Sequence, residues 1–434
     1  MPRVILCFHV VFAFGVSLVS AQEATLIVEN ARVIIGDGTV LERGTVVVSG
    51  DRIISVGAEQ VEATGARRID ASGGTVLPGL IDTHVHLLME HLFEQPRSDS
   101  ALYEFMEARL PARLQAYTDA GITTVMSAGD FWPFINDVSE RIQSGDLTGP
   151  RVYAAGPLFT AQGGHPAATF CGSMDMHGPN PWCREHLTEE VVTSEDVRAA
   201  VARLNRDGVN QIKFVYEGPS EADVKSLKAN LVGEIIDAAH EQGLRTYAHI
   251  LELPLAIEAI ESGLDGLVHL PAVSSQPDET GRLVQLMLAE GVAASTTLTT
   301  FDSMMEIAAE QGDDGLSQIM SGLLDGMKQT LAQLAEMNEG LVVLGTDAPH
   351  LPPAGAFYRE IELMAETGLA PERIIQAATR DAAKYVGLGD ELGTLEPGML
   401  ADLIVVDGNP LSDLSVLQEI RSVVKGGEIV APIN

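Results

Sequence analysis

Eight short apolar segments alternate with amphipathic stretches between residues 79 and 397, and this alternation limits the fold more than any other feature. The candidate strands span residues 79–86, 122–127, 151–155, 209–215, 244–249, 265–269, 292–298 and 341–346. Gly121, Gly208 and Gly243 each stand just before a strand, as is typical of glycines that end helices. Eight βα units predict a parallel (β/α)8 barrel. A doubly wound open sheet is the alternative, although no GxGxxG motif follows the first strand.

The two ends of the chain have a different pattern from this middle part. Short alternating segments separated by the turn signals GDG and SGD fill residues 24–57, and DLIVVDGN and IRSVVKGGEIV near the C-terminus are similar. We therefore expect an α/β chain with a barrel over residues 79–397 and a small sheet domain made from both termini. Apolar residues make up 46% of the chain and charged residues 20%, which is enough for a buried core.

The first 21 residues, MPRVILCFHVVFAFGVSLVSA, have the pattern of an export signal. Arg3 precedes an apolar run, and Val19, Ser20 and Ala21 provide the small residues of a cleavage site. The run is short for a membrane span. We predict a signal peptide over residues 1–21, a periplasmic or secreted mature protein, and no stable membrane association after cleavage. An uncleaved N-terminal anchor is the alternative.

Acidic residues greatly outnumber basic ones. The chain has 27 Lys and Arg against 61 Asp and Glu, which gives a net charge of −34. Such a surface repels phosphate backbones and anionic lipid headgroups. The charge therefore argues against nucleic-acid binding and against electrostatic attachment to membranes.

Two cysteines remain after removal of the predicted signal peptide. Cys171 and Cys183 lie in a segment rich in glycine and proline, and export would place them where disulfides persist. We expect a disulfide between them, with two unpaired thiols as the alternative. Neither belongs to a CxxC motif, so a zinc site at the cysteines is disfavoured.

Six residues with metal-binding or proton-transfer chemistry lie at five of the eight predicted strand ends, where barrels of this kind carry their active sites. These residues are His84, His86, Lys213, His249, His269 and Asp347. Taken singly, a histidine can be solvated, a lysine can extend to the surface and an aspartate can cap a helix. Together the six predict a metal site. Histidine and carboxylate ligands suit Zn²⁺, and Mn²⁺, Co²⁺, Fe²⁺ and Ni²⁺ stay open.

Other residues are candidates for substrate binding. His165 lies in the long segment between Gly156 and Thr193, which we expect to form part of a lid. Tyr216 follows Lys213 closely, with a packing role as the alternative, and His350 lies in the loop after the eighth strand.

Several phrases together resemble the metal-dependent amidohydrolase superfamily, and within it the imidazolonepropionase-like and exported, Xaa-Pro dipeptidase-like branches. The phrases are VLPGLIDTHVH, QIKFVYEG, AHILELPLAIEAIESGLDGLVHLP, GTDAPH and LGTLEPGMLADLIVVDGNPL. The resemblance implies a (β/α)8 TIM barrel over residues 79–397, a β-sandwich built from residues 22–78 and 398–434, and two divalent ions. His84 and His86 would bind the more buried ion, and His249 and His269 the more exposed one. N-carboxylated Lys213 would bridge both ions, and Asp347 would bind the buried ion and transfer the proton.

The resemblance implies a hydrolase that cleaves the amide bond of a small molecule, a dipeptide or an N-acyl amino acid, with a metal-bridging hydroxide. Asp347 would accept the proton of the water and pass it to the leaving group. Hydrolysis of cyclic amides, lactones, carbamates or esters is the alternative. Deamination is disfavoured, because the deaminases that resemble this superfamily use one metal and no bridging lysine. A metal-containing binding protein without turnover is a further alternative, and a homo-oligomer stays open.

Overall fold

The computed structural model describes residues 24–59, 61–89, 94–218, 224–272, 277–337 and 340–431. The predicted signal peptide over residues 1–21 lies outside this part of the chain. Among the helices that are described, none has the length and apolar character required to cross a membrane.

Eight parallel strands form a closed barrel, as the alternating pattern predicts. They are β6 (Leu80–Val85), β7 (Ile122–Ser127), β8 (Arg151–Ala154), β11 (Gln211–Val215), β12 (Arg245–His249), β13 (Gly266–Leu267), β14 (Ala293–Ser295) and β15 (Val342–Val343). Strands β6 to β8 pair in one sheet and β11 to β15 in another. Two backbone hydrogen bonds join the sheets: Asn210 N donates to Ala154 O at 3.0 Å, and Thr83 N donates to Leu344 O at 2.9 Å. The open-sheet alternative is therefore wrong.

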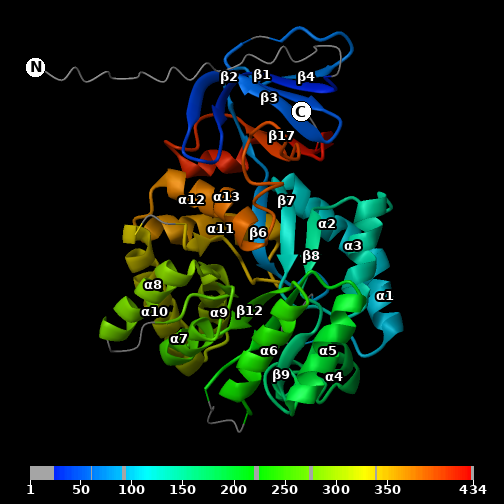
Figure 1. Ribbon diagram of the computed structural model, residues 1–434, viewed down its shortest axis with the longest axis vertical. Helices are drawn as coiled ribbons and strands as arrows, with labels where there is room; N and C mark the ends of the chain where they lie inside the picture. Colours follow the sequence, from blue (N-terminus) through cyan, green and yellow to red (C-terminus); the bar gives the residue numbers. More distant parts are fainter. Residues whose placement is uncertain are drawn as a thin grey trace, which may run out of the picture.

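Helices connect the strands and cover the outside of the barrel (Figure 1). They are α1 (Asp99–Ala108), α2 (Leu110–Asp119), α3 (Phe134–Ser144), α5 (Ser194–Arg206), α6 (Ala229–Glu241), α7 (Leu253–Glu261), α8 (Pro277–Glu290), α9 (Leu298–Glu310), α10 (Asp314–Met337), α11 (Pro353–Glu366), α12 (Pro371–Ala377) and α13 (Arg380–Tyr385). Thr193 and Asp196 form a capping box that starts α5. Gly121, Gly208 and Gly243 have positive φ angles at the ends of the preceding helices, which a side chain would disfavour.

Strands from both ends of the chain form a separate sheet next to the barrel (Figure 1). The strands are β1 (Leu26–Ile34), β2 (Val40–Ser49), β3 (Arg52–Gly57), β4 (Arg67–Asp70), β5 (Thr75–Pro78), β16 (Leu403–Val406), β17 (Ile420–Lys425) and β18 (Glu428–Ala431). The C-terminal strands join the N-terminal ones where β16 pairs antiparallel with β5. This sheet packs around its own apolar core, which includes Val28, Val46 and Leu403. The fold is thus a TIM barrel with a β-sandwich made by both termini.

The segment between Gly156 and Thr193, which we expect to form part of a lid, has regular structure. It contains β9 (Leu158–Ala161), the short helix η1 (Thr169–Ser173), α4 (Pro181–Leu187) and β10 (Thr188–Val191). Strands β9 and β10 pair in parallel, and β9 touches β11 through Phe159 and Phe214. Cys171 and Cys183 form a disulfide that ties η1 to α4. The insertion is therefore fixed to the barrel at its edge.

Candidate metal centre and active-site cavity

His84, His86 and Asp347 converge at the C-terminal end of the barrel. Asp347 Oδ1 lies 3.3 Å from His84 Nε2 and 3.1 Å from His86 Nε2. One ligand atom from each of the three residues lies within 4.8 Å of the others. The Nδ1 atoms of both histidines face backbone oxygens, that of Val268 at 2.8 Å and that of Gly129. These contacts favour the tautomer that leaves each Nε2 free to bind an ion.

A buried aspartate fixes the backbone that carries these ligands. Asp82 Oδ1 accepts the backbone N–H groups of His84 and Thr346, each at 3.1 Å, and Thr346 Oγ1 donates to Asp82 Oδ2 at 2.8 Å. Burial raises the pKa of Asp82 to about 7, although these hydrogen bonds oppose the shift. Asp347 itself has a φ angle of 49°, and its backbone N–H donates to His84 O at 2.8 Å. The ends of β6 and β15 are thereby held together.

His269 presents a buried ring nitrogen with no protein partner. Its Nδ1 lies 2.8 Å from Thr297 Oγ1, and its Nε2 makes no hydrogen bond to any described residue. That Nε2 lies 4.0 Å from Asp347 Oδ2. Burial holds the pKa of His269 well below 6.5, so the ring is neutral, which is the form that binds metals. An unsatisfied buried nitrogen is costly, and a metal ion would satisfy it.

Lys213 lies inside the barrel beside the histidines. Its side chain is buried, and its Nζ lies 3.2 Å from His84 Nε2. Burial lowers the pKa of Lys213 to about 8, although the charge of Asp347 opposes the shift. An amine with such a pKa is partly neutral near pH 7 to 8, and only the neutral form can react with carbon dioxide. The lysine therefore has the chemistry that a carbamate ligand requires.

Glu217 is a site residue that the sequence reasoning missed. Its Oε1 lies 2.9 Å from His249 Nε2. Burial acts to raise the pKa of Glu217, but the contact with His249 outweighs it and lowers the pKa to about 2. Alternation along a strand could have revealed it, because Lys213, Val215 and Glu217 point to one side. A carboxylate that holds a ligand histidine is a common partner of metal sites.

The six residues predicted as ligands therefore lie together, and we call His84, His86, Lys213, His249, His269 and Asp347 the ligand cluster. Adjacent imidazole rings in the cluster are close: the ring centroids of His84 and His269 are 4.9 Å apart and those of His249 and His269 are 4.3 Å apart. Neutral imidazoles, a carboxylate and a lysine amine are a donor set that fits divalent transition metals such as Zn²⁺.

The ligand cluster opens into a cavity of about 290 Å³. Besides members of the cluster, its lining includes Glu217, His165, Thr300 and thirteen apolar side chains, and we call these thirteen the apolar wall. The apolar wall consists of Met89, Leu158, Pro166, Phe170, Met174, Leu187, Val215, Leu251, Phe301, Met304, Met320, Leu323 and Pro349. The insertion between β8 and β11 and the helices α9 and α10 supply most of it.

Of the three residues predicted to bind substrate, only His165 lines the cavity. Its Nδ1 lies 2.6 Å from Thr169 Oγ1, and its ring centroid is 5.5 Å from that of His249. Tyr216 lies on the other side of the chain from Lys213 and donates from its hydroxyl to Glu258 Oε2 at 2.7 Å. His350 Nε2 lies 2.9 Å from Ser303 Oγ, and His350 is not among the residues that line the cavity. The structure therefore does not support substrate contacts for Tyr216 and His350.

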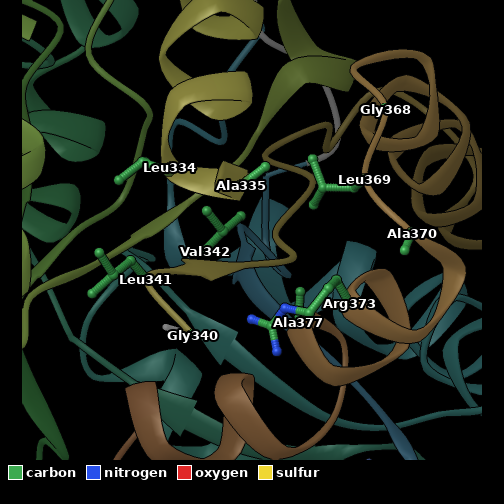
Figure 2. A pocket seen from close by; sticks show the side chains of 10 residues that line it. All are labelled: Leu334, Ala335, Gly340, Leu341, Val342, Gly368, Leu369, Ala370, Arg373 and Ala377. Carbon is green, nitrogen blue, oxygen red and sulfur yellow. The ribbon is translucent and has the colours of Figure 1, made fainter. Parts of the chain in front are cut away.

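A second cavity, of about 260 Å³, lies near the N-terminal end of β15 (Figure 2). Small and aliphatic side chains line it, together with Arg373. The guanidinium of Arg373 donates to Asp381 Oδ2 at 3.2 Å and to Gln376. No member of the ligand cluster lines this cavity, so we assign the chemistry to the first one.

Comparison with known proteins decides the family. The model of the amidohydrolase family matches residues 75–430, which is most of the chain. The chain belongs to the amidohydrolase family. Its members generally use divalent metals, and the cluster of His84, His86 and Asp347 agrees with this. The amidohydrolase is accordingly a hydrolase that acts on carbon–nitrogen bonds.

Individual relatives align with nearly the whole of this chain. The ochratoxinase of Aspergillus niger is 27% identical over 445 aligned residues, which cover 95% of this chain and 88% of the relative. A crystal structure of a Xaa-Pro dipeptidase with bound methionine superposes with a TM-score of 0.77 at 26% identity, and covers 93% of this chain and 99% of its own. A prolidase complexed with N-methylphosphonate-L-proline gives a TM-score of 0.78 at 26% identity, with coverage of 93% and 98%. The predicted resemblance to the superfamily and to its dipeptidase-like branch is confirmed.

Proposed function

We propose that this amidohydrolase is a binuclear metal-dependent hydrolase that cleaves the amide bond of dipeptides or N-acyl amino acids. The observation that carries the proposal is that five of the six residues of the ligand cluster line one cavity and the sixth, His84, contacts Asp347, while the buried Nε2 of His269 has no hydrogen-bond partner among the described residues. The similarity to structures named as a Xaa-Pro dipeptidase and a prolidase supports the substrate class.

The residues of the ligand cluster form two groups, one for each proposed ion. His84, His86 and Asp347 would hold one divalent ion, and His249 and His269 would hold the other. Lys213, as an N-carboxylated side chain, would offer one oxygen to each, and Zn²⁺ suits this set best. When bound, such ions polarise a carbonyl group and lower the pKa of water.

Asp347 is placed to move the proton. Burial acts to raise its pKa, but the neighbouring His84 and His86 outweigh this and hold the pKa well below 3.8. Its carboxylate is thus ionised at neutral pH and can accept a proton from the attacking water. It can then deliver that proton to the nitrogen of the leaving amine, which would otherwise leave as an unfavourable anion.

We also propose that the protein acts in the periplasm or outside the cell. The export-signal pattern of residues 1–21 supports this, and so does the disulfide between Cys171 and Cys183, since disulfides persist in oxidising compartments. Sequencing the N-terminus of protein recovered from the periplasm or medium should find a chain that begins near Gln22. Protein confined to the cytoplasm with an intact N-terminus would contradict the proposal.

A hydrolysis screen tests the activity. The metal-loaded protein is assayed against dipeptides, N-acyl amino acids, lactones and esters, and then again after chelation and after Zn²⁺ is restored. We expect amide cleavage that chelation abolishes and Zn²⁺ restores. Tyr216→Phe serves as a matched control with near wild-type rates, because the Tyr216 hydroxyl binds Glu258 away from the cavity. Turnover of esters or lactones alone, or of no compound, would contradict the proposed function.

A further inference from the structure

Away from the ligand cluster, the cavity is almost entirely apolar. Met174 and Leu187 come from the insertion, Leu251 from the segment after β12, and Phe301 and Met320 from α9 and α10. These side chains line the same cavity although they lie far apart in the sequence. When a ligand fills such a cavity, its apolar surface is removed from water, and this removal favours binding.

The carboxylates that line the cavity already have partners. Asp347 lies against His84 and His86, and Glu217 lies against His249. Neither carboxylate is left over to pair with an ammonium group of a ligand. A ligand ammonium among the described wall residues would therefore lose its water without gaining an ion pair.

The described lining contains no cation outside the ligand cluster. Its one lysine is Lys213, and it has no arginine. Arg113 lies behind the lining and donates to Met89 O at 2.7 Å and to Pro349 O at 2.9 Å. Among the described residues, a carboxylate of the substrate thus has no basic side chain to meet inside the cavity, and it faces the mouth and water.

We propose that the cavity takes the acyl side of the substrate and selects a bulky, uncharged, apolar acyl group, so that N-acyl amino acids are preferred over dipeptides with a free α-ammonium. The inference rests on the proposed function and narrows its substrate class. The amino acid's carboxylate points to the mouth, which places the acyl group against the apolar wall. An ammonium on the carbon next to the scissile carbonyl would be buried there without an ion-pair partner among the described residues.

A pair of matched substrates tests this directly. L-Leucyl-L-leucine and 4-methylpentanoyl-L-leucine differ only in the α-ammonium. We expect kcat/KM to be more than about 10-fold higher for the acyl compound, because an uncompensated charge in an apolar site is strongly rejected. Equal values, or a higher value for the dipeptide, would overturn the proposal.

A variant pair locates the selectivity in the apolar wall. Met320→Glu places a carboxylate in the wall and should reduce the ratio between the two substrates several-fold. Ile319→Glu is the control: Ile319 is the neighbouring residue on α10, does not line the cavity and is 60% exposed. The ratio should be unchanged in the control. An unchanged ratio in well-folded Met320→Glu, or the same change in both variants, would contradict the assignment.

Failure of the proposed function is distinguishable from failure of this inference. If neither substrate is cleaved, the proposed amide hydrolysis is wrong for these substrates. A binding experiment then tests whether the cavity prefers an uncharged acyl group. Calorimetric titration of the metal-loaded protein with 4-methylpentanoate and with L-leucine compares two ligands that differ only in the ammonium. Tighter binding of 4-methylpentanoate supports the apolar acyl site, and equal or tighter binding of L-leucine overturns it.

Discussion

Five residues of the ligand cluster and the apolar wall line the same cavity, but the cluster and the wall come from different parts of the fold. Every ligand follows or lies in a barrel strand. The Nδ1 atoms of His84, His86 and His269 are held by the neighbours Val268, Gly129 and Thr297. The apolar wall comes mainly from an insertion and from two helices, and its members make few polar contacts. In our proposal, the barrel thus supplies the residues for the chemistry, and the insertion with α9 and α10 supplies most of the residues that select the substrate. The two parts can be perturbed separately.

Changing the proton-transfer residue should have the largest effect. Asp347→Asn should keep the fold, because Asn tolerates the positive φ angle of 49° at this position. Without a carboxylate to move the proton, we expect kcat to fall by about 10²- to 10⁴-fold. Steady-state kinetics with metal analysis of the same sample measures this, and wild-type turnover in a metal-loaded variant would remove Asp347 from the mechanism.

Removing the lysine should have the next largest effect. Lys213→Ala should lose one ligand shared by both ions, so that metal content falls and activity drops by about 10²-fold, in the range seen when metal sites are disturbed. Short carboxylic acids should restore part of the activity, because they can replace the carbamate. Full activity without added acid would contradict the bridging role. Loss of activity without any rescue would leave only a packing role for Lys213.

Opening the disulfide should mainly affect the apolar wall. The bond between Cys171 and Cys183 spans the insertion that carries Phe170, Met174 and Leu187. Replacing both cysteines with serine should lower the free energy of unfolding by about 2–3 kcal/mol in the chain-entropy model, and should raise KM for apolar substrates more than it lowers kcat. Thermal denaturation and kinetics of the variant measure the two effects. A fall in kcat at constant KM would show that the insertion supports the ligand cluster instead.

Glu360 gives a prediction that concerns stability alone, a dependence of the free energy of unfolding on pH. Its carboxylate accepts the backbone N–H groups of Leu298 and Thr299 at 3.0 and 2.7 Å, at the start of the helix that carries Phe301. Burial raises the pKa of Glu360 from 4.5 to about 7. Between pH 4.5 and about 7, the folded state therefore holds a proton that the unfolded chain has lost. The free energy of unfolding consequently falls as the pH rises through this range.

Glu360→Gln should remove this pH dependence. The variant has one acceptor fewer at every pH, and its amide cannot take up the proton that Glu360 binds. Its free energy of unfolding should therefore be lowest, relative to that of the wild type, near pH 5. It should improve by an amount on the order of 2–3 kcal/mol by pH 8. Denaturant unfolding at several pH values checks this. Parallel stability profiles for the two proteins would show that Glu360 does not titrate in this range.

The ligand cluster could be predicted from the sequence because local rules determine it. His84 and His86 are two residues apart on one strand, and the other ligands follow apolar runs at strand ends, where a barrel directs them inward. The same alternation would have placed Glu217 inside and Tyr216 outside, which the interpretation of Tyr216 overlooked. The apolar wall could not be predicted in this way. Its members meet only through long-range packing of the insertion, α9 and α10, and their sequence signals resemble those of any buried side chain.

The central claim is that the ligand cluster is a binuclear metal site that hydrolyses amides. Stepwise addition of Zn²⁺ to metal-free protein, with the hydrolysis rate of an N-acyl amino acid measured at each step, tests it most directly. We predict that activity rises from a negligible value and levels off at two equivalents of Zn²⁺ per chain. Full activity of the metal-free protein, or a plateau at one equivalent, would contradict the claim.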